Sequence, residues 1–92
     1  MTQEQVKEYL CDHGWEETIV FENPSYSNAF MGVTCDGNAV YDFEKMVGCL
    51  QEEDGMDYTD AVEFIEYNTI RALPYMGAMA PIVFYPLDES QL

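Results

Sequence analysis

Apolar side chains recur every three or four residues in three segments of the chain, which predicts three helices. The first is expected over residues 3–13, between a capping box at its start and a glycine just after its end. The second is expected to begin after Asp42 and to end at Gly55. The third is expected to begin after Asp57 and to stop at Pro74, so that the last two helices form a helical hairpin.

Short runs rich in β-branched and aromatic residues predict the strands, which are expected over 18–21, 29–34, 39–41 and 82–85. The second and third runs flank Asp36-Gly37, a dipeptide that tolerates the positive φ angles of a tight hairpin. The last run lies between two prolines, which favours an edge strand.

The resulting order of elements, α-β-β-β-α-α-β, predicts one small α+β domain over residues 1–92. We expect a three- to four-stranded, mainly antiparallel sheet with the N-terminal helix and the helical hairpin on one face. Residues 88–92 are expected to form a frayed tail. Apolar residues make up 48% of the chain and aromatic residues 14%, which distinguishes it from acidic disordered tails that have little to bury.

Charge is the strongest compositional signal: 18 acidic residues stand against 3 basic ones, a formal net charge of -15. Nucleic acid and anionic membranes are excluded as direct partners, because both require Lys and Arg to neutralise phosphate. A basic protein surface is the expected partner, and the sequence leaves the oligomeric state open.

The three cysteines form no CxxC pair and are odd in number, so neither a disulfide framework nor a zinc site is expected. The N-terminal residues show no signal peptide, and no apolar run is long enough to cross a membrane. These observations together predict a cytoplasmic protein.

Side chains that carry catalysis are scarce. The single histidine, His13, falls in the last turn of the first helix and is interpreted as structural. Only Lys7, Lys45 and Arg71 are basic, and no glycine-rich phosphate loop is present, so no nucleotide or other cofactor is expected. Arg71 is expected to pair internally with a carboxylate.

Carboxylates cluster around Gly55, but their spacing does not match the alternating oxygen ligands of a calcium-binding loop. The sequence therefore predicts only weak, nonspecific binding of divalent ions. A carboxylate-dependent hydrolase with a divalent metal stays open as an alternative of low weight.

The acidic residues of the helical hairpin form the predicted partner-binding site. They recur at three- and four-residue spacing, which places like charges about 5 to 6 Å apart and destabilises an isolated helix. Four tyrosines, at positions 26, 58, 67 and 75, fall where full burial is not expected, and exposed tyrosines are favoured at interfaces. The predicted site comprises Glu52, Glu53, Asp54, Asp57, Tyr58, Asp60, Glu63, Glu66 and Tyr67.

Part of this hairpin resembles a known group of proteins. The run from Glu66 to Tyr75, Glu-Tyr-Asn-Thr-Ile-Arg-Ala-Leu-Pro-Tyr, is similar to a segment of small uncharacterised acidic proteins of bacteria, prophages and bacteriophages, with weaker similarity over residues 39–85. The resemblance implies a cytoplasmic, mobile-element context and no enzymatic activity.

Two further interpretations of the charge follow. In the first, the chain is a non-enzymatic acidic interaction protein that imitates closely spaced nucleic-acid phosphates and occupies the basic, nucleic-acid-binding surface of a partner, as a phage-type inhibitor would. In the second, it is a small structural or accessory protein whose charge serves solubility alone.

Overall fold

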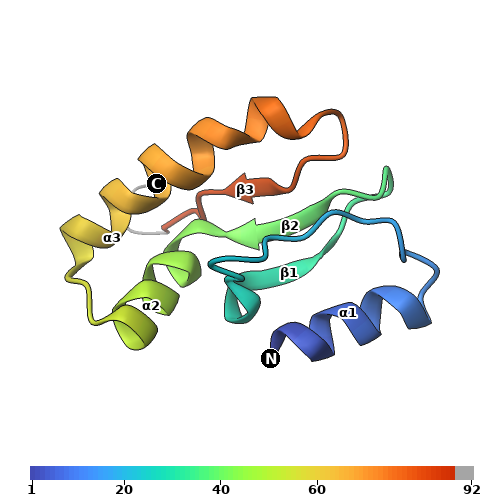
Figure 1. Cartoon of the computed structure of the whole chain (residues 1–92), viewed down its shortest axis with the longest axis horizontal. Helices are drawn as coiled ribbons and strands as arrows, with labels where there is room; N and C mark the ends of the chain where they lie inside the picture. The colour runs from blue at the N-terminus through green and yellow to red at the C-terminus, as the bar shows by residue number, and fades with distance from the viewer. Residues whose placement is uncertain (89–92) are drawn as a thin grey trace.

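A computed structural model describes residues 1–88 of the chain, and the remainder of the predicted tail lies outside this range. The elements are α1 (Gln3–Asp12), a 3-10 turn η1 (Ser27–Ala29), β1 (Phe30–Val33), β2 (Ala39–Asp42), α2 (Phe43–Asp54), α3 (Tyr58–Phe64), a π turn η2 (Ile65–Thr69), a 3-10 segment η3 (Ile70–Met76) and β3 (Ile82–Phe84) (Figure 1). The predicted α+β class is confirmed, with the observed order α-β-β-α-α-β.

The helix ends follow from the side chains that cap them. The side chains and backbones of Thr2 and Gln5 form the predicted capping box at the start of α1. Asp42 accepts a 3.2 Å hydrogen bond from the Lys45 amide at the start of α2, and Gly55 ends α2 in the left-handed region at φ 67°. None of the helices in residues 1–88 combines the length and the apolar character that crossing a lipid bilayer requires.

Within residues 1–88 the sheet has three strands, with β2 in the centre. The hairpin partner β1 runs antiparallel to β2, and its Phe30 lies opposite Tyr41. Strand β3 runs parallel to β2, with Val83 opposite Tyr41, so the mainly antiparallel prediction is wrong at this pair. The physical reason is the connection: the chain leaves β2 and returns through α2 and α3, and such a crossover brings the next strand back in the same direction. The predicted edge position of the last strand is confirmed.

The predicted strand over 18–21 does not form, which removes one strand from the expected order. The segment crosses in front of β2 instead (Figure 1), and side chains satisfy part of its backbone. The Phe21 amide donates to the Tyr41 hydroxyl at 3.3 Å, and the Phe21 carbonyl accepts from Gln3 Nε2 at 2.8 Å. β-branched and aromatic residues favour strands mainly through packing on a sheet, and here Phe21 and Val20 pack against the core cluster that contains Tyr41 without joining the sheet.

The third predicted helix forms, but its winding changes twice. The α-helix ends at Phe64, a π turn follows over Ile65–Thr69, and 3-10 winding continues to Met76. The prediction that Pro74 stops the helix is therefore wrong. By that point the segment is no longer α-helical, and Pro74 lies within the 3-10 winding.

The core lies on the sheet face that carries Tyr41. This ring contacts those of Phe21 and Phe30, with centroids 4.7 and 5.7 Å away. Tyr26 is buried as well, against the expectation of partial exposure. Helix α1 joins the same side, because Tyr9 packs edge-on against Phe30 at 6.0 Å. Buried residues from α2, α3 and η2 belong to the same cluster: Phe43, Met46, Val47, Cys49, Leu50, Ala61 and Ile65.

Candidate functional site

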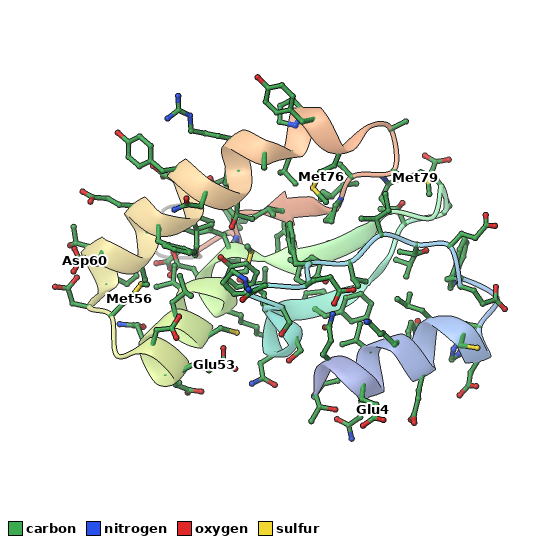
Figure 2. All side chains as sticks on the ribbon, in the orientation of Figure 1. Glu4, Glu53, Met56, Asp60, Met76 and Met79 are labelled. Carbon is green, nitrogen blue, oxygen red and sulfur yellow. The ribbon has the colours of Figure 1, made fainter. Side chains whose placement is uncertain are left out.

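The junction of α2 and α3 carries the predicted partner-binding site. All nine of its residues are exposed. Figure 2 shows Glu53 on α2 and Asp60 on α3 at the same end of the molecule, with Met56 in the turn between them. We call seven carboxylates that run from the last turn of α2 through α3 into η2 the acidic corner: Glu52, Glu53, Asp54, Asp57, Asp60, Glu63 and Glu66.

The last turn of α2 places negative charge where it does not stabilise the helix. It contains Glu52, Glu53 and Asp54 and no basic residue. The carbonyls at a helix C-terminus already carry a partial negative charge, so acidic side chains there are unfavourable by a few tenths of a kcal/mol each. The stability of α2 therefore does not explain why its last turn contains three acidic residues.

One residue of the acidic corner has a clear structural role. Asp57 is the N-cap of α3, and its Oδ1 accepts a 2.8 Å hydrogen bond from the Asp60 amide. Negative charge at a helix N-terminus is favourable. Asp57 therefore contributes to folding as well as to the negative field of the corner.

Tyr58 connects the two helices of the hairpin. Its hydroxyl donates to both carboxylate oxygens of Glu44, at 3.0 and 3.2 Å. The bond to Glu44 raises the pKa of this phenol above its usual value. Half of the residue remains exposed, 51%, so the ring keeps a surface that a partner can cover.

Tyr67 lies beside the only arginine of the chain. The Arg71 guanidinium carbon is 5.3 Å from the centroid of the Tyr67 ring, a cation–π contact. Arg71 forms no ion pair within residues 1–88, so the prediction that it pairs with a carboxylate is wrong for this part of the chain. Tyr67 is 65% exposed, and together with Arg71 and Glu66 it lines a shallow surface hollow.

Glu52 extends the acidic corner along a second side of α2. It lines a groove of about 310 Å³ that also includes Asn28, Glu44 and Lys45. The Lys45 ammonium contacts the sulfur of Met31 at 3.7 Å rather than a carboxylate. The described part of the chain contains one ion pair, between Lys7 and Glu22, so no residue of the acidic corner is neutralised there.

The described residues offer little for catalysis. No group of three or more His, Cys, Asp or Glu side chains in residues 1–88 converges to hold a metal ion. His13 is fixed by a 2.8 Å contact from Nδ1 to the Tyr9 carbonyl and by ring contact with Tyr9, which supports its structural interpretation. Burial raises the pKa of the Cys49 thiol, and Cys11 and Cys35 are exposed free thiols.

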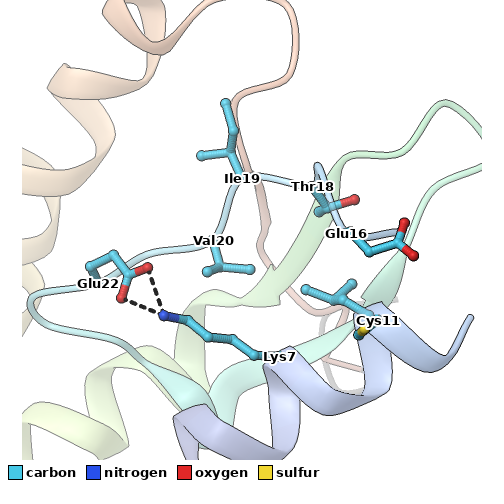
Figure 3. Close-up of a pocket in the computed structure, with 8 residues that line it drawn as sticks. Lys7, Cys11, Glu16, Thr18, Ile19, Val20 and Glu22 are labelled. Atoms are coloured by element: carbon cyan, nitrogen blue, oxygen red, sulfur yellow. Dashed lines mark hydrogen bonds and ion pairs between the residues drawn. The ribbon is translucent and has the colours of Figure 1, made fainter. Parts of the chain in front are cut away.

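A larger cavity separates α1 from the segment that follows it. Its volume is about 480 Å³, and Figure 3 shows the Lys7–Glu22 ion pair at its edge, with Nζ and Oε1 3.1 Å apart. The wall is apolar where Leu10, Ile19 and Val20 contribute. Because Lys7 is already paired, the cavity presents no free cation to a ligand.

Sequence reasoning missed a second group of residues at the other end of the molecule. Trp15, Glu16, Glu17, Asp36 and Met79 meet around a cavity near the tip of the β1–β2 hairpin. The only local signal was a single tryptophan followed by two glutamates. Asp36 and Met79 come from distant segments, so the sequence alone did not connect them.

Comparison of this chain with protein-family models, with curated proteins and with solved structures finds no match.

Proposed function

We propose that this chain is a non-enzymatic interaction protein whose acidic corner docks on a basic surface of a partner protein. The observation that carries the proposal is the run of seven exposed carboxylates from the end of α2 through α3 into η2, none of them ion-paired within residues 1–88. Crowded like charges and acidic residues at the end of α2 lower the stability of the free protein. A cationic partner surface would reduce both the repulsion between these carboxylates and their unfavourable interaction with the C-terminus of α2.

Two tyrosines give this surface its apolar anchors. Tyr58 and Tyr67 flank the α3 carboxylates and remain half or more exposed. Tyrosine is enriched among the residues that dominate binding energy, whereas the surrounding charges mainly steer association. The combination suits a partner surface with both basic and apolar groups.

A surface that binds nucleic acid is the kind of partner surface that fits best. Carboxylates repeated along a helix imitate a row of phosphates, and the net charge of -15 favours fast association with a cationic groove. An inhibitor of a host defence nuclease or regulator would fit the resemblance to prophage and bacteriophage proteins that the sequence suggests. The exposed thiols of Cys11 and Cys35 suit the reducing cytoplasm in which such an inhibitor would act.

The test compares three proteins. The corner variant carries Asp60→Asn, Glu63→Gln and Glu66→Gln, and the matched control carries Glu4→Gln, Glu8→Gln and Asp12→Asn on α1. Both lose three exposed helical carboxylates, so the two have the same net charge. A partner captured from bacterial lysate by the wild type is purified, and its association rate is measured with all three proteins.

The corner variant should associate about tenfold more slowly than the control, with a weaker dependence on salt. A short DNA duplex should compete with the wild type for the captured partner. Equal association rates for the corner variant and the control would show that the acidic corner is not the docking surface. Failure of the duplex to compete would reject the nucleic-acid-binding surface as the target.

A further inference from the structure

Three loops that are distant in sequence meet at the tip of the β1–β2 hairpin, at the opposite end of the molecule from the α2–α3 junction (Figure 1). They line an open cavity of about 390 Å³, a volume within the range of small-molecule sites. We call it the Trp15 cavity, and its lining residues are Gly14, Trp15, Glu16, Glu17, Thr18, Asp36, Gly37 and Met79.

Hydrogen bonds fix all three loops relative to one another. The Thr18 hydroxyl donates to the Gly37 carbonyl at 3.0 Å, which ties the segment after α1 to the hairpin tip. The Asn38 side-chain amide donates to the carbonyls of Ala78 and Ala80, at 3.0 and 2.9 Å, which ties the tip to the loop before β3. The walls of the cavity are therefore held in place before any ligand arrives.

Trp15 and Met79 form the apolar wall, and the side chains of both pack against Gly37. A Cβ atom at position 37 would lie 3.1 Å from Met79 Cε and 3.5 Å from Trp15 Cζ3. Gly37 also has a φ of +91°, which side chains other than glycine rarely adopt. This glycine allows the indole and the thioether to pack against the backbone of the hairpin tip.

The charged residues of the lining are all acidic. Glu16, Glu17 and Asp36 contribute three carboxylates, and all three residues are exposed. The one ion pair in residues 1–88 lies elsewhere, between Lys7 and Glu22. Among residues 1–88, none of those that line the Trp15 cavity is basic. The cavity therefore combines an aromatic wall with an unneutralised acidic rim.

We propose that the Trp15 cavity binds an organic cation that carries a guanidinium or a methylated ammonium group. Weakly hydrated cations of this kind gain from the face of an indole and from nearby carboxylates, and they lose less hydration than a compact ammonium or a metal ion does. A hard divalent ion needs several oxygens converging on one point, and the described carboxylates do not converge in this way. The inference goes beyond the proposed function, because it uses none of the residues of the acidic corner.

Trp15 supplies the readout, since it is the only tryptophan of the chain. The full chain is titrated at constant ionic strength with tetramethylammonium chloride, ethylguanidinium chloride and N-acetyl-arginine amide, with sodium chloride as the reference. At least one organic cation should give a saturable change in indole fluorescence with a millimolar midpoint. A response no different from that of sodium chloride would overturn the proposal.

Variants then locate the site. Combined Glu16→Gln, Glu17→Gln and Asp36→Asn should weaken binding about tenfold, whereas the matched control Glu4→Gln, Glu8→Gln and Asp12→Asn should change it less than about twofold. Equal weakening by both sets would mean general attraction to an acidic protein and would overturn the site. Trp15→Phe, followed by calorimetry, should also weaken binding, and unchanged affinity in a folded Trp15→Phe protein would contradict the aromatic wall.

The probes also distinguish two sources of the cation. Tighter binding of N-acetyl-arginine amide than of ethylguanidinium would assign the cavity to an arginine side chain of a partner. The reverse order would assign it to a free small molecule. If the variant with Glu16→Gln, Glu17→Gln and Asp36→Asn loses cation binding but associates with the captured partner as the wild type does, the Trp15 cavity and the acidic corner are independent binding surfaces.

Discussion

The hydroxyl of Tyr26 lies 3.0 Å from Oγ1 of Thr69, and both groups are buried. Tyr26 adopts the left-handed conformation at φ 50°, just before η1, and Thr69 closes the π turn η2. This contact joins the long loop after α1 to the segment where the third helix changes its winding. A bulky residue in the left-handed region costs energy, so packing and this hydrogen bond must hold it there.

Removing either hydroxyl should destabilise the protein. Tyr26→Phe and Thr69→Val should each lower the free energy of unfolding by about 1–2 kcal/mol, because each leaves a buried hydroxyl without its partner. The double variant should lose less than the sum of the two, since both changes remove the same bond. Urea unfolding of the four proteins measures the cycle, and strictly additive losses would show that the two hydroxyls do not depend on each other.

Alkaline pH should destabilise the fold through Tyr41. Burial raises the pKa of this phenol to about 12, despite the opposing bond from the Phe21 amide. Below pH 10 Tyr41 is protonated in both the folded and the unfolded chain. Between pH 10 and about 12 the unfolded chain releases the proton first, so the free energy of unfolding should fall by up to about 1.4 kcal/mol per pH unit.

Tyr41→Phe is the control for this pH dependence. It should lower stability at neutral pH by about 1 kcal/mol, because the Phe21 amide loses its acceptor. Above pH 10 its stability should decline less steeply than that of the wild type. Parallel curves for the two proteins would assign the alkaline loss to other groups.

Gly37 and Gly48 should respond in opposite directions to the same substitution. Gly37→Ala should destabilise the protein by about 1 kcal/mol or more, because of its φ of +91° and the 3.1 Å approach to Met79 Cε. Gly48 lies within α2 and has open space around its missing side chain, so Gly48→Ala should stabilise by about 0.5–1 kcal/mol. Thermal unfolding measures both, and a neutral Gly37→Ala would contradict the packed wall of the Trp15 cavity.

Salt should stabilise the wild-type protein. Added sodium chloride screens like charges beyond a Debye length of about 8–10 Å, so the melting temperature should rise between low and moderate salt. The corner variant with Asp60→Asn, Glu63→Gln and Glu66→Gln should melt higher than the wild type at low salt and should gain less from added salt. A wild-type melting temperature independent of salt would mean that the acidic side chains do not repel one another appreciably.

The sequence predicted the features that short segments determine. Thr2, Asp42 and Asp57 are the N-caps of α1, α2 and α3, at the positions that the sequence predicted from their side-chain chemistry. The charged residues of the acidic corner are exposed, as expected for carboxylates without a buried partner. The structural role of Tyr58 could not be predicted, because its partner Glu44 lies on the preceding helix and only the angle between the helices brings them together.

The errors arose where tertiary structure overrides local preference. Residues 18–21 have strand composition, yet the backbone of Phe21 is bonded to the side chains of Gln3 and Tyr41, which are distant in sequence, and not to a neighbouring strand. The direction of β3 depends on the path of the helical crossover, which no local pattern records. The Trp15 cavity escaped prediction for the same reason, because three separate loops build it.

The parallel pairing of β2 with β3 also affects the order in which the fold can assemble. The β1–β2 hairpin forms between neighbouring segments, but a two-stranded hairpin alone is marginally stable in water. Its third strand arrives only after α2, α3, η2 and η3 have closed a long loop back to β2. During synthesis the sheet therefore stays incomplete until β3 emerges, and β2 presents an unpaired edge for most of that time. Charge repulsion between nascent copies of this acidic chain would keep other chains from pairing with that edge until β3 occupies it.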